Sequence, residues 1–163
     1  MDARTVESRH LRQALGRFAT GVTIVTCCDA KGGFVGLTVN SFNSLSLDPP
    51  LVLWALRGVS SHLQDFSGAA SFAVNVLSLA QVDLSRRFAS SQPHRFSSTD
   101  WALGPHGAPV LTGCAAVLEC ATVSHQDAGD HRLFIGRVLA CSDTKLPPLV
   151  FQAGHYRQLG ELI

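Results

Sequence analysis

Small hydrogen-bonding side chains are concentrated between Gly36 and Pro50, in the sequence GLTVNSFNSLSLDPP. Hydroxyl and amide groups offer donors and acceptors without net charge, and small side chains let a flat ligand approach the backbone closely. A polar heteroaromatic ring that carries carbonyl groups and ring nitrogens would suit such a wall. By composition alone, however, an edge strand rich in Ser and Thr that ends in a turn at Asp48-Pro49-Pro50 explains the same residues and is favoured.

A second group of candidate residues, Arg57, Ser60 and Ser61, lies between an expected strand and an expected short helix. Proteins bind phosphate groups through arginine, hydroxyl groups and free backbone N–H groups. Ser60 is a candidate N-cap, and the N-terminus of a helix attracts anions. Ordinary capping explains Ser60 equally well, so both interpretations stay open.

The tripeptide Gly129-Asp130-His131 is the most distinctive local motif. A Gly-Asp turn at the end of a strand can project the following side chain over a pocket. A single histidine at the start of a strand is nevertheless more often structural or solvated than catalytic. The histidines at positions 10, 62, 106 and 125 are scattered and lack the spacing of metal ligands, so no metal site is expected.

Other chemistries lack their sequence signatures. There is no glycine-rich dinucleotide fingerprint, which disfavours a Rossmann dehydrogenase, and no GxSxG element or Cys-His arrangement that would suggest hydrolysis. Five cysteines without a CxxC pair predict neither a disulfide framework nor a zinc site. The 13 basic and 12 acidic residues leave no electrostatic footprint for nucleic acid or an anionic membrane.

Composition predicts one folded domain over residues 1–163 with a sizeable core. A hydrophobic content of 46% and a charged content of 15% argue against disorder, and the low charge suggests that an oligomer hides some surface. The polar start MDARTVESRH lacks the apolar core of a signal peptide, and no apolar run approaches the about 18 residues that cross a bilayer. A cytoplasmic location without membrane contact is therefore expected.

The elements that must position these residues are mainly strands. The pattern predicts strands over residues 18–28, 34–42, 50–57, 71–77, 113–125 and 131–142, and a final strand from Leu149. It predicts helices over residues 5–17, 60–66 and 79–90, and a long connection over residues 90–109. Phe18 is expected to pack beneath the strand that follows it, and residues 50–57 to be covered on both faces. Many strands with tight turns and few helices indicate an antiparallel barrel.

Several blocks of the sequence resemble, in order and spacing, the short-chain flavin reductases, which are the reductase components of two-component flavin-dependent monooxygenases. The blocks are TVNSFNSLSLDPPLVLWAL, with RQALGRFATGVTIVT upstream and SFAVNVLSLAQVDLSRRFA, GDHRLFIGRV and PLVFQAGHYRQL downstream. The similarity spans about residues 11–159. It implies a mainly β fold with peripheral helices, namely the Greek-key antiparallel split β-barrel of that family. Members are usually homodimers that bind flavin near the subunit interface.

The resemblance also implies roles for individual residues. The segment from Thr38 to Ser41 would meet the polar edge of the flavin ring, and Ser44 the ribityl chain or the phosphate. His131 would help to position the reduced nicotinamide over the flavin, while Asp130 fixes the turn. The family often has an Asp-Lys-Phe-like segment where this chain has His94-Arg95-Phe96, so Arg95 keeps the positive charge. The full set of residues expected to bind cofactor is Thr38, Val39, Asn40, Ser41, Ser44, Arg57, Ser60, Ser61, Phe88, Arg95, Gly129, Asp130 and Tyr156.

The function that the resemblance implies is NAD(P)H-dependent reduction of FMN or FAD by hydride transfer, with the reduced flavin supplied to a partner monooxygenase. Two alternatives stay open. One is a split-barrel flavoprotein that keeps its flavin and reduces another acceptor, such as ferric iron; the other is a flavin-binding module without turnover. The residues do not choose FMN over FAD, or NADH over NADPH.

Overall fold

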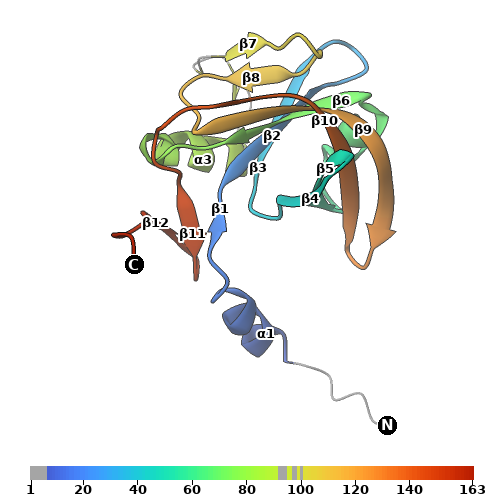
Figure 1. Ribbon diagram of the computed structural model, residues 1–163. Helices are drawn as coiled ribbons and strands as arrows, with labels where there is room; N and C mark the ends of the chain where they lie inside the picture. Colours follow the sequence, from blue (N-terminus) through green and yellow to red (C-terminus); the bar gives the residue numbers. More distant parts are fainter. Residues whose placement is uncertain (1–6, 92–94, 97–98, 100) are drawn as a thin grey trace.

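Strands are the predominant secondary structure of the computed structural model, which describes residues 7–91, 95–96, 99 and 101–163 (Figure 1). The helices are α1 (Ser8–Leu15), α2 (Leu63–Gly68) and α3 (Val82–Ala89), and a 3-10 turn (Leu79–Gln81) leads into α3. The strands are β1 (Thr20–Gly21), β2 (Thr23–Cys28), β3 (Phe34–Val39), β4 (Asn43–Leu47), β5 (Pro50–Arg57), β6 (Ser71–Val76), β7 (Trp101–Leu103), β8 (Pro109–Leu111), β9 (Ala116–Ala128), β10 (His131–Asp143), β11 (Val150–Gln152) and β12 (His155–Arg157).

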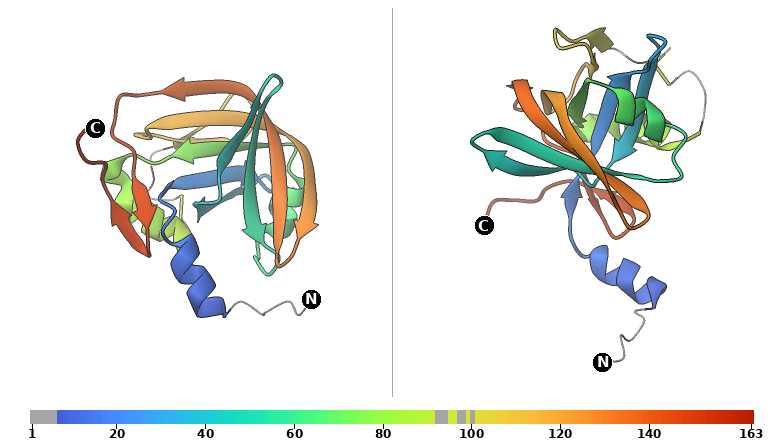
Figure 2. Two further views of the ribbon diagram at one scale, coloured as in Figure 1. Left: turned by 60° about the horizontal axis from the view of Figure 1, so that its bottom comes forward. Right: turned by 90° about the vertical axis from the view of Figure 1, so that its right-hand side faces the viewer.

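Seven of these strands form one sheet in the order β3-β2-β6-β9-β10-β5-β4, with antiparallel neighbours throughout. Figure 2 shows this sheet curving around a common interior, with the helices at its periphery. Strands β1, β11 and β12 form a second sheet, and β7 pairs with β8. The mainly β, antiparallel architecture with peripheral helices that the sequence predicts is therefore observed.

The turn residues fix the hairpins. In the turn between β2 and β3, the Asp29 carboxylate accepts the backbone N–H groups of Lys31 and Gly33 at 2.7 and 2.8 Å, which lowers the pKa of Asp29. Leu47 pairs with Pro50, so β4 and β5 are joined through Asp48 and Pro49. The sequence correctly places this turn and an edge strand before it, although the strand predicted over residues 34–42 ends before β4 begins.

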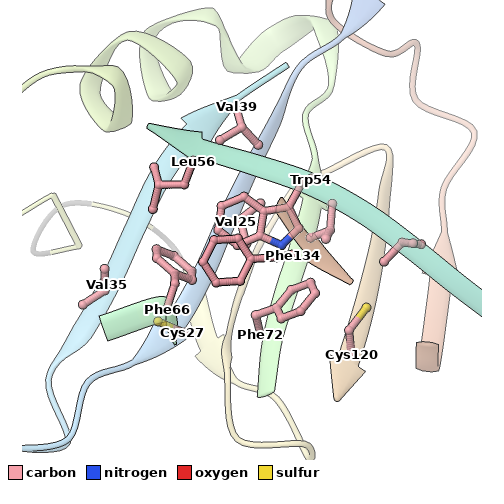
Figure 3. Packing of buried hydrophobic residues seen from close by; sticks show 12 residues of the cluster. Val25, Cys27, Val35, Val39, Trp54, Leu56, Phe66, Phe72, Cys120 and Phe134 are labelled. Atoms are coloured by element: carbon pink, nitrogen blue, oxygen red, sulfur yellow. The ribbon is translucent and has the colours of Figure 1, made fainter. Parts of the chain in front are cut away.

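The core inside the barrel is aromatic (Figure 3). Trp54 of β5 stacks on Phe134 of β10 with ring centroids 4.5 Å apart, because the two residues are register partners. Phe66 and Phe72 meet the Trp54 ring edge-on at 4.9 and 5.8 Å. A Cβ at Gly136 would lie 2.3 Å from the Phe72 ring, so glycine is needed there for close packing.

A second core cluster lies beneath α3. Phe88 is buried and packs edge-on against Phe96 at 5.1 Å. A Cβ at Gly36 would lie 2.7 Å from the Phe88 ring, so the glycine of β3 lets α3 approach this strand closely. Leu79, Val82 and Leu84, in the segment predicted as a helix over residues 79–90, also pack against this cluster.

The N-terminal prediction is wrong in part. Helix α1 spans Ser8–Leu15, and no residue of it is buried. Phe18 is 73% exposed rather than packed beneath β2. Leu11 and Leu15 of α1 are 44% and 64% exposed. Residues 5 and 6 of the predicted helix lie outside the described residues.

Two further differences concern strands. The single final strand is instead a hairpin of β11 and β12, which turns at Ala153 and Gly154 with φ of 50° and 81°. Residues 51–56 alternate between half-buried and buried side chains, and Pro50 and Arg57 are exposed, so β5 is fully covered on one face only, and not on both as predicted. The connection over residues 90–109 includes β7 and the first residue of β8.

Candidate functional site

A cavity of about 580 Å³ lies where the ends of β3, β5 and α3 and the turn before α2 come together. Its lining combines the apolar residues Leu37, Leu56 and Phe88 with arginine, serine and histidine residues. A flat apolar ring with a polar anionic tail would match this combination. Nine of the residues predicted to bind cofactor line the cavity: Thr38, Val39, Asn40, Ser41, Arg57, Ser60, Ser61, Phe88 and Arg95.

Hydroxyl groups of the predicted ring-binding segment brace the wall of this cavity. Thr38 Oγ1 donates to the backbone oxygen of Ser85 at 2.7 Å, which holds α3 against β3. Ser41 Oγ donates to the backbone oxygen of Ala55 and accepts its N–H, both at 2.9 Å, which holds β5. Val39 is buried in the core, and Asn40 is exposed at the rim. The hydroxyl groups of Thr38 and Ser41 are therefore engaged in bonds within the protein, whereas Asn40 is exposed.

The turn before α2 contributes Ser60 and Ser61, with their hydroxyl groups, to the cavity lining. Ser60 was predicted as the N-cap, but α2 begins at Leu63 with His62 at its N-cap. A turn closed by the bond from Leu63 N to Ser60 O at 3.2 Å precedes the helix, which displaces Ser60 from the capping position. Its Oγ accepts the backbone N–H of His62 at 3.3 Å.

Arg95 also lines the cavity and contributes a positively charged side chain to it. Its Nη1 donates to the Gly36 oxygen of β3 at 2.9 Å, and its Nη2 donates to the Ser90 oxygen at the end of α3. Burial lowers the pKa of Arg95, although a guanidinium stays charged at neutral pH. Its neighbour in the predicted family segment, His94, lies outside the described residues.

The motif at 129–131 lies beside this cavity without lining it. Ala128 pairs with His131, so Gly129 and Asp130 form the hairpin turn, with φ of 63° at Gly129. His131 is the register partner of Arg57, and the Asp130 oxygen accepts the Gly58 N–H at 2.8 Å. The turn is thus bonded directly to the strand end that contributes Arg57 to the cavity.

Electrostatic contacts fix the side chains of this turn. Asp130 Oδ1 lies 2.7 Å from His131 Nδ1, and this hydrogen bond lowers the pKa of Asp130, with a smaller contribution from the Arg57 charge. The His131 side chain is 41% exposed, which leaves it accessible at the rim.

Two predicted residues lie away from the cavity within this chain. Ser44 is an exposed residue of the edge strand β4. Tyr156 lies on β12, packs in the cluster beneath α3, and bonds to Ser85 Oγ at 2.9 Å, with the Arg86 guanidinium 5.5 Å from its ring centroid. Tyr156 therefore reaches the cavity wall only through Ser85, whose backbone oxygen holds Thr38.

His62, Ser90 and Ser91 also line the cavity, and the sequence did not single them out for this site. Serines at a helix end and a lone histidine are common features without a functional signal. Within the described residues, no group of three or more His, Cys, Asp or Glu side chains is arranged to hold a metal ion. No helix among them is long and apolar enough to span a membrane.

A comparison with protein families matches residues 15–160 to the flavin reductase like domain. The chain belongs to the flavin reductase-like family. The resemblance carried by the sequence blocks is thereby confirmed, since this match spans most of the chain. The site described above is accordingly a candidate flavin site of a flavin reductase-like domain.

Several named proteins are similar in sequence to this flavin reductase-like chain. A probable flavin reductase of Rhizobium meliloti (strain 1021) is 45% identical over 156 residues, which are 96% of this chain and 50% of that protein. The FMN reductase (NADH) SmoA of Agrobacterium fabrum is 45% identical over 149 residues, 91% of this chain and 84% of SmoA. The flavin-dependent monooxygenase reductase subunit HsaB of Rhodococcus jostii is 40% identical over 155 residues, 94% of this chain and 79% of HsaB. The chain thus spans half the length of the Rhizobium protein.

A solved structure confirms the predicted split-barrel fold of the family. The NADH:FAD oxidoreductase SgcE6 of Streptomyces globisporus, solved with NAD and FAD fragments, superposes with a TM-score of 0.89. It is 36% identical in sequence, and the match covers 97% of this chain and 98% of SgcE6.

Proposed function

We propose that this protein is an NAD(P)H-dependent flavin reductase that binds FMN or FAD in the cavity between β3, β5 and α3. The observation that carries the proposal is a single cavity lined both by apolar residues and by arginines and serines. The isoalloxazine ring suits the apolar residues, and the phosphate suits the arginine and hydroxyl groups. The names of SmoA and SgcE6 support NADH as the hydride donor.

The residues present fit such a ligand. The wall formed by Thr38 to Ser41 is braced by its own hydroxyl groups, so its shape is largely set before a ligand enters. Arg95 and the hydroxyl groups of Ser60 and Ser61 would hold the phosphate, with Arg57 at the rim. When bound, the flavin supplies the acceptor for a hydride from the reduced nicotinamide.

His131 is the residue we assign to the nicotinamide. Asp130 holds Nδ1 of its ring, and pairing with Arg57 keeps the turn at the cavity rim. Hydride transfer between two cofactors depends mainly on alignment and close approach, so the task of His131 is to orient the nicotinamide rather than to transfer a proton.

The reduced flavin would pass to a separate monooxygenase, as the name of HsaB supports. We also include a homodimer in the proposal. Leu11, Leu15 and Phe18 are exposed on and just after α1, a helix too short to be stable without packing. A second copy of the chain would cover such a surface. All five cysteines are free thiols, which supports a reducing cytoplasmic location.

A variant that fills the cavity tests the proposed site. Ala89 is an exposed residue at the end of α3 that lines the cavity, so Ala89→Phe should fill part of the cavity without removing a side-chain hydrogen bond. We expect the Kd for FMN and for FAD, measured by quenching of flavin fluorescence, to rise by at least about tenfold. Ala80→Phe, at an exposed position outside the cavity, is the matched control. Unchanged flavin binding by Ala89→Phe would refute this location of the site.

A further inference from the structure

The side chains of Asp65, His62 and Arg95 form a continuous series of hydrogen-bonding contacts along one wall of the cavity. Asp65 Oδ2 lies 3.2 Å from His62 Nδ1, and His62 Nε2 lies 3.5 Å from Arg95 Nη1. The His62 and Asp65 side chains are 29% and 31% exposed, so water only partly competes for these contacts. Both His62 and Arg95 line the cavity.

If the His62 imidazole is neutral, only one assignment of donors and acceptors satisfies both of its contacts. A carboxylate only accepts hydrogen bonds, so the proton of His62 lies on Nδ1, towards Asp65. Nε2 then presents a lone pair to Arg95, whose guanidinium only donates. Asp65 thus selects the tautomer in which His62 accepts from the arginine.

Contacts from three separate elements hold the Arg95 guanidinium. Besides His62 at the start of α2, the backbone oxygens of Gly36 in β3 and Ser90 after α3 accept from it. An arginine side chain has many rotamers, and ordering it costs free energy on binding unless the free protein has already ordered it. His62 is therefore one of three groups that orient the Arg95 guanidinium, and the only side chain among these three.

We propose that His62, oriented by Asp65, is a positioning residue that fixes the Arg95 guanidinium for the phosphate of a bound flavin. The inference rests on the proposed function, in which Arg95 and the hydroxyl groups of Ser60 and Ser61 hold the phosphate of the flavin. It predicts that the His62–Asp65 pair acts on phosphorylated flavins and not on the ring itself.

The test compares the binding of FMN with that of riboflavin, which has the same ring without the phosphate, by quenching of flavin fluorescence. We expect His62→Leu to raise the Kd for FMN by about fivefold to tenfold and to leave the Kd for riboflavin unchanged. Asp65→Asn should shift the Kd for FMN in the same direction by a smaller factor. His62→Gln should retain most of the affinity, since its amide oxygen can accept from Arg95.

Two controls separate positioning from a general loss of structure. Asp83→Asn removes the carboxylate of another i,i+3 contact, the exposed pair with Arg86 outside the cavity, and should leave both Kd values unchanged. In an Arg95→Gln background, His62→Leu should add no further loss of FMN affinity, because the two residues act through one interaction.

Three outcomes would overturn the inference. The first is an equal loss of FMN and riboflavin affinity in His62→Leu. The second is a loss of FMN affinity in the double variant that equals the sum of the losses from His62→Leu and Arg95→Gln. The third is an unchanged Kd for FMN in both His62→Leu and Asp65→Asn. If His62→Leu does not fold, Asp65→Asn and His62→Gln decide between the same outcomes. A wild-type protein that binds neither flavin would instead refute the proposed function, and the inference with it.

Discussion

At the scale of single residues, the rim of the cavity combines a histidine, an aspartate and an arginine. His131 and Arg57 are register partners on neighbouring strands, and Asp130 contacts His131 directly. Such a group can orient a neutral ring and meet an anionic neighbour at the same edge of a pocket. This arrangement is the basis for assigning His131 to the nicotinamide rather than to the flavin.

We predict that His131→Ala raises the KM for NADH by about tenfold and leaves the Kd for flavin within about twofold, since only nicotinamide alignment is lost. Steady-state kinetics at saturating flavin, together with a flavin-binding titration, measures both quantities. His125→Ala, on the same hairpin but outside the turn and the cavity lining, is the control. Nicotinamide kinetics that stay unchanged in His131→Ala would remove this role.

The residue types at the site could be predicted, but their hydrogen-bond partners could not. The run of small polar residues from Thr38 to Ser41 lines the cavity. The groups that their hydroxyls contact belong to Ser85 and Ala55, which are distant in sequence. No local pattern shows which hydroxyl braces the fold and which faces the cavity.

At the scale of elements, the sequence predicts most strands because turn chemistry and strand pattern agree. It ends the strand predicted over residues 34–42 before β4 and misses β12, since both strands are short and lie next to tight turns. It also extends the helix predicted over residues 5–17 past the end of α1 at Leu15, and periodicity does not show whether the same chain covers an apolar face.

A buried polar network attaches the small β7–β8 hairpin to the large sheet. Asn75 of β6 is fully buried; its Oδ1 accepts the Leu111 N–H at 2.8 Å, and its Nδ2 donates to the Ile24 oxygen at 3.0 Å and to Thr26 Oγ1 at 3.2 Å. Thr26 Oγ1 in turn donates to the Pro109 oxygen of β8. Loss of the amide would leave several buried groups without partners.

We therefore predict that Asn75→Ala lowers the free energy of unfolding by about 2–4 kcal/mol, measured by urea denaturation. Hydrogen exchange at the Leu111 amide should rise more than exchange in β9 and β10, because the loss is centred on the hairpin. Gly68→Ala, where an added Cβ meets nothing within 4 Å, is a control for the denaturation measurement. A stability equal to that of the wild type would show that the network contributes little.

At the scale of the whole molecule, apolar surface remains uncovered in the single chain. Phe18 and Leu47 are 73% and 93% exposed, and the charged content is only 15%. Exposed apolar side chains that gather on one surface usually mark an interface. The exposed face of α1 and the residues that follow it are the natural place for a second copy.

We predict a mass of twice 17.4 kDa by sedimentation equilibrium at micromolar concentration. Leu15→Glu, which places a charge on the uncovered face of α1, should shift the equilibrium towards monomer, because the charge would be buried in the dimer. Arg9→Glu also changes the charge of α1, and serves to separate the loss of an apolar contact from a change in charge. A wild-type protein that stays monomeric would contradict the proposed dimer.

The central claim is that this chain catalyses reduction of flavin by a nicotinamide in the cavity between β3, β5 and α3. The most direct test follows the nicotinamide absorbance with purified wild-type protein and NADH or NADPH, in the presence of FMN, FAD or no flavin. We predict oxidation that requires an added flavin and that falls in Ala89→Phe but not in Ala80→Phe. No oxidation with any combination of donor and flavin would contradict the account.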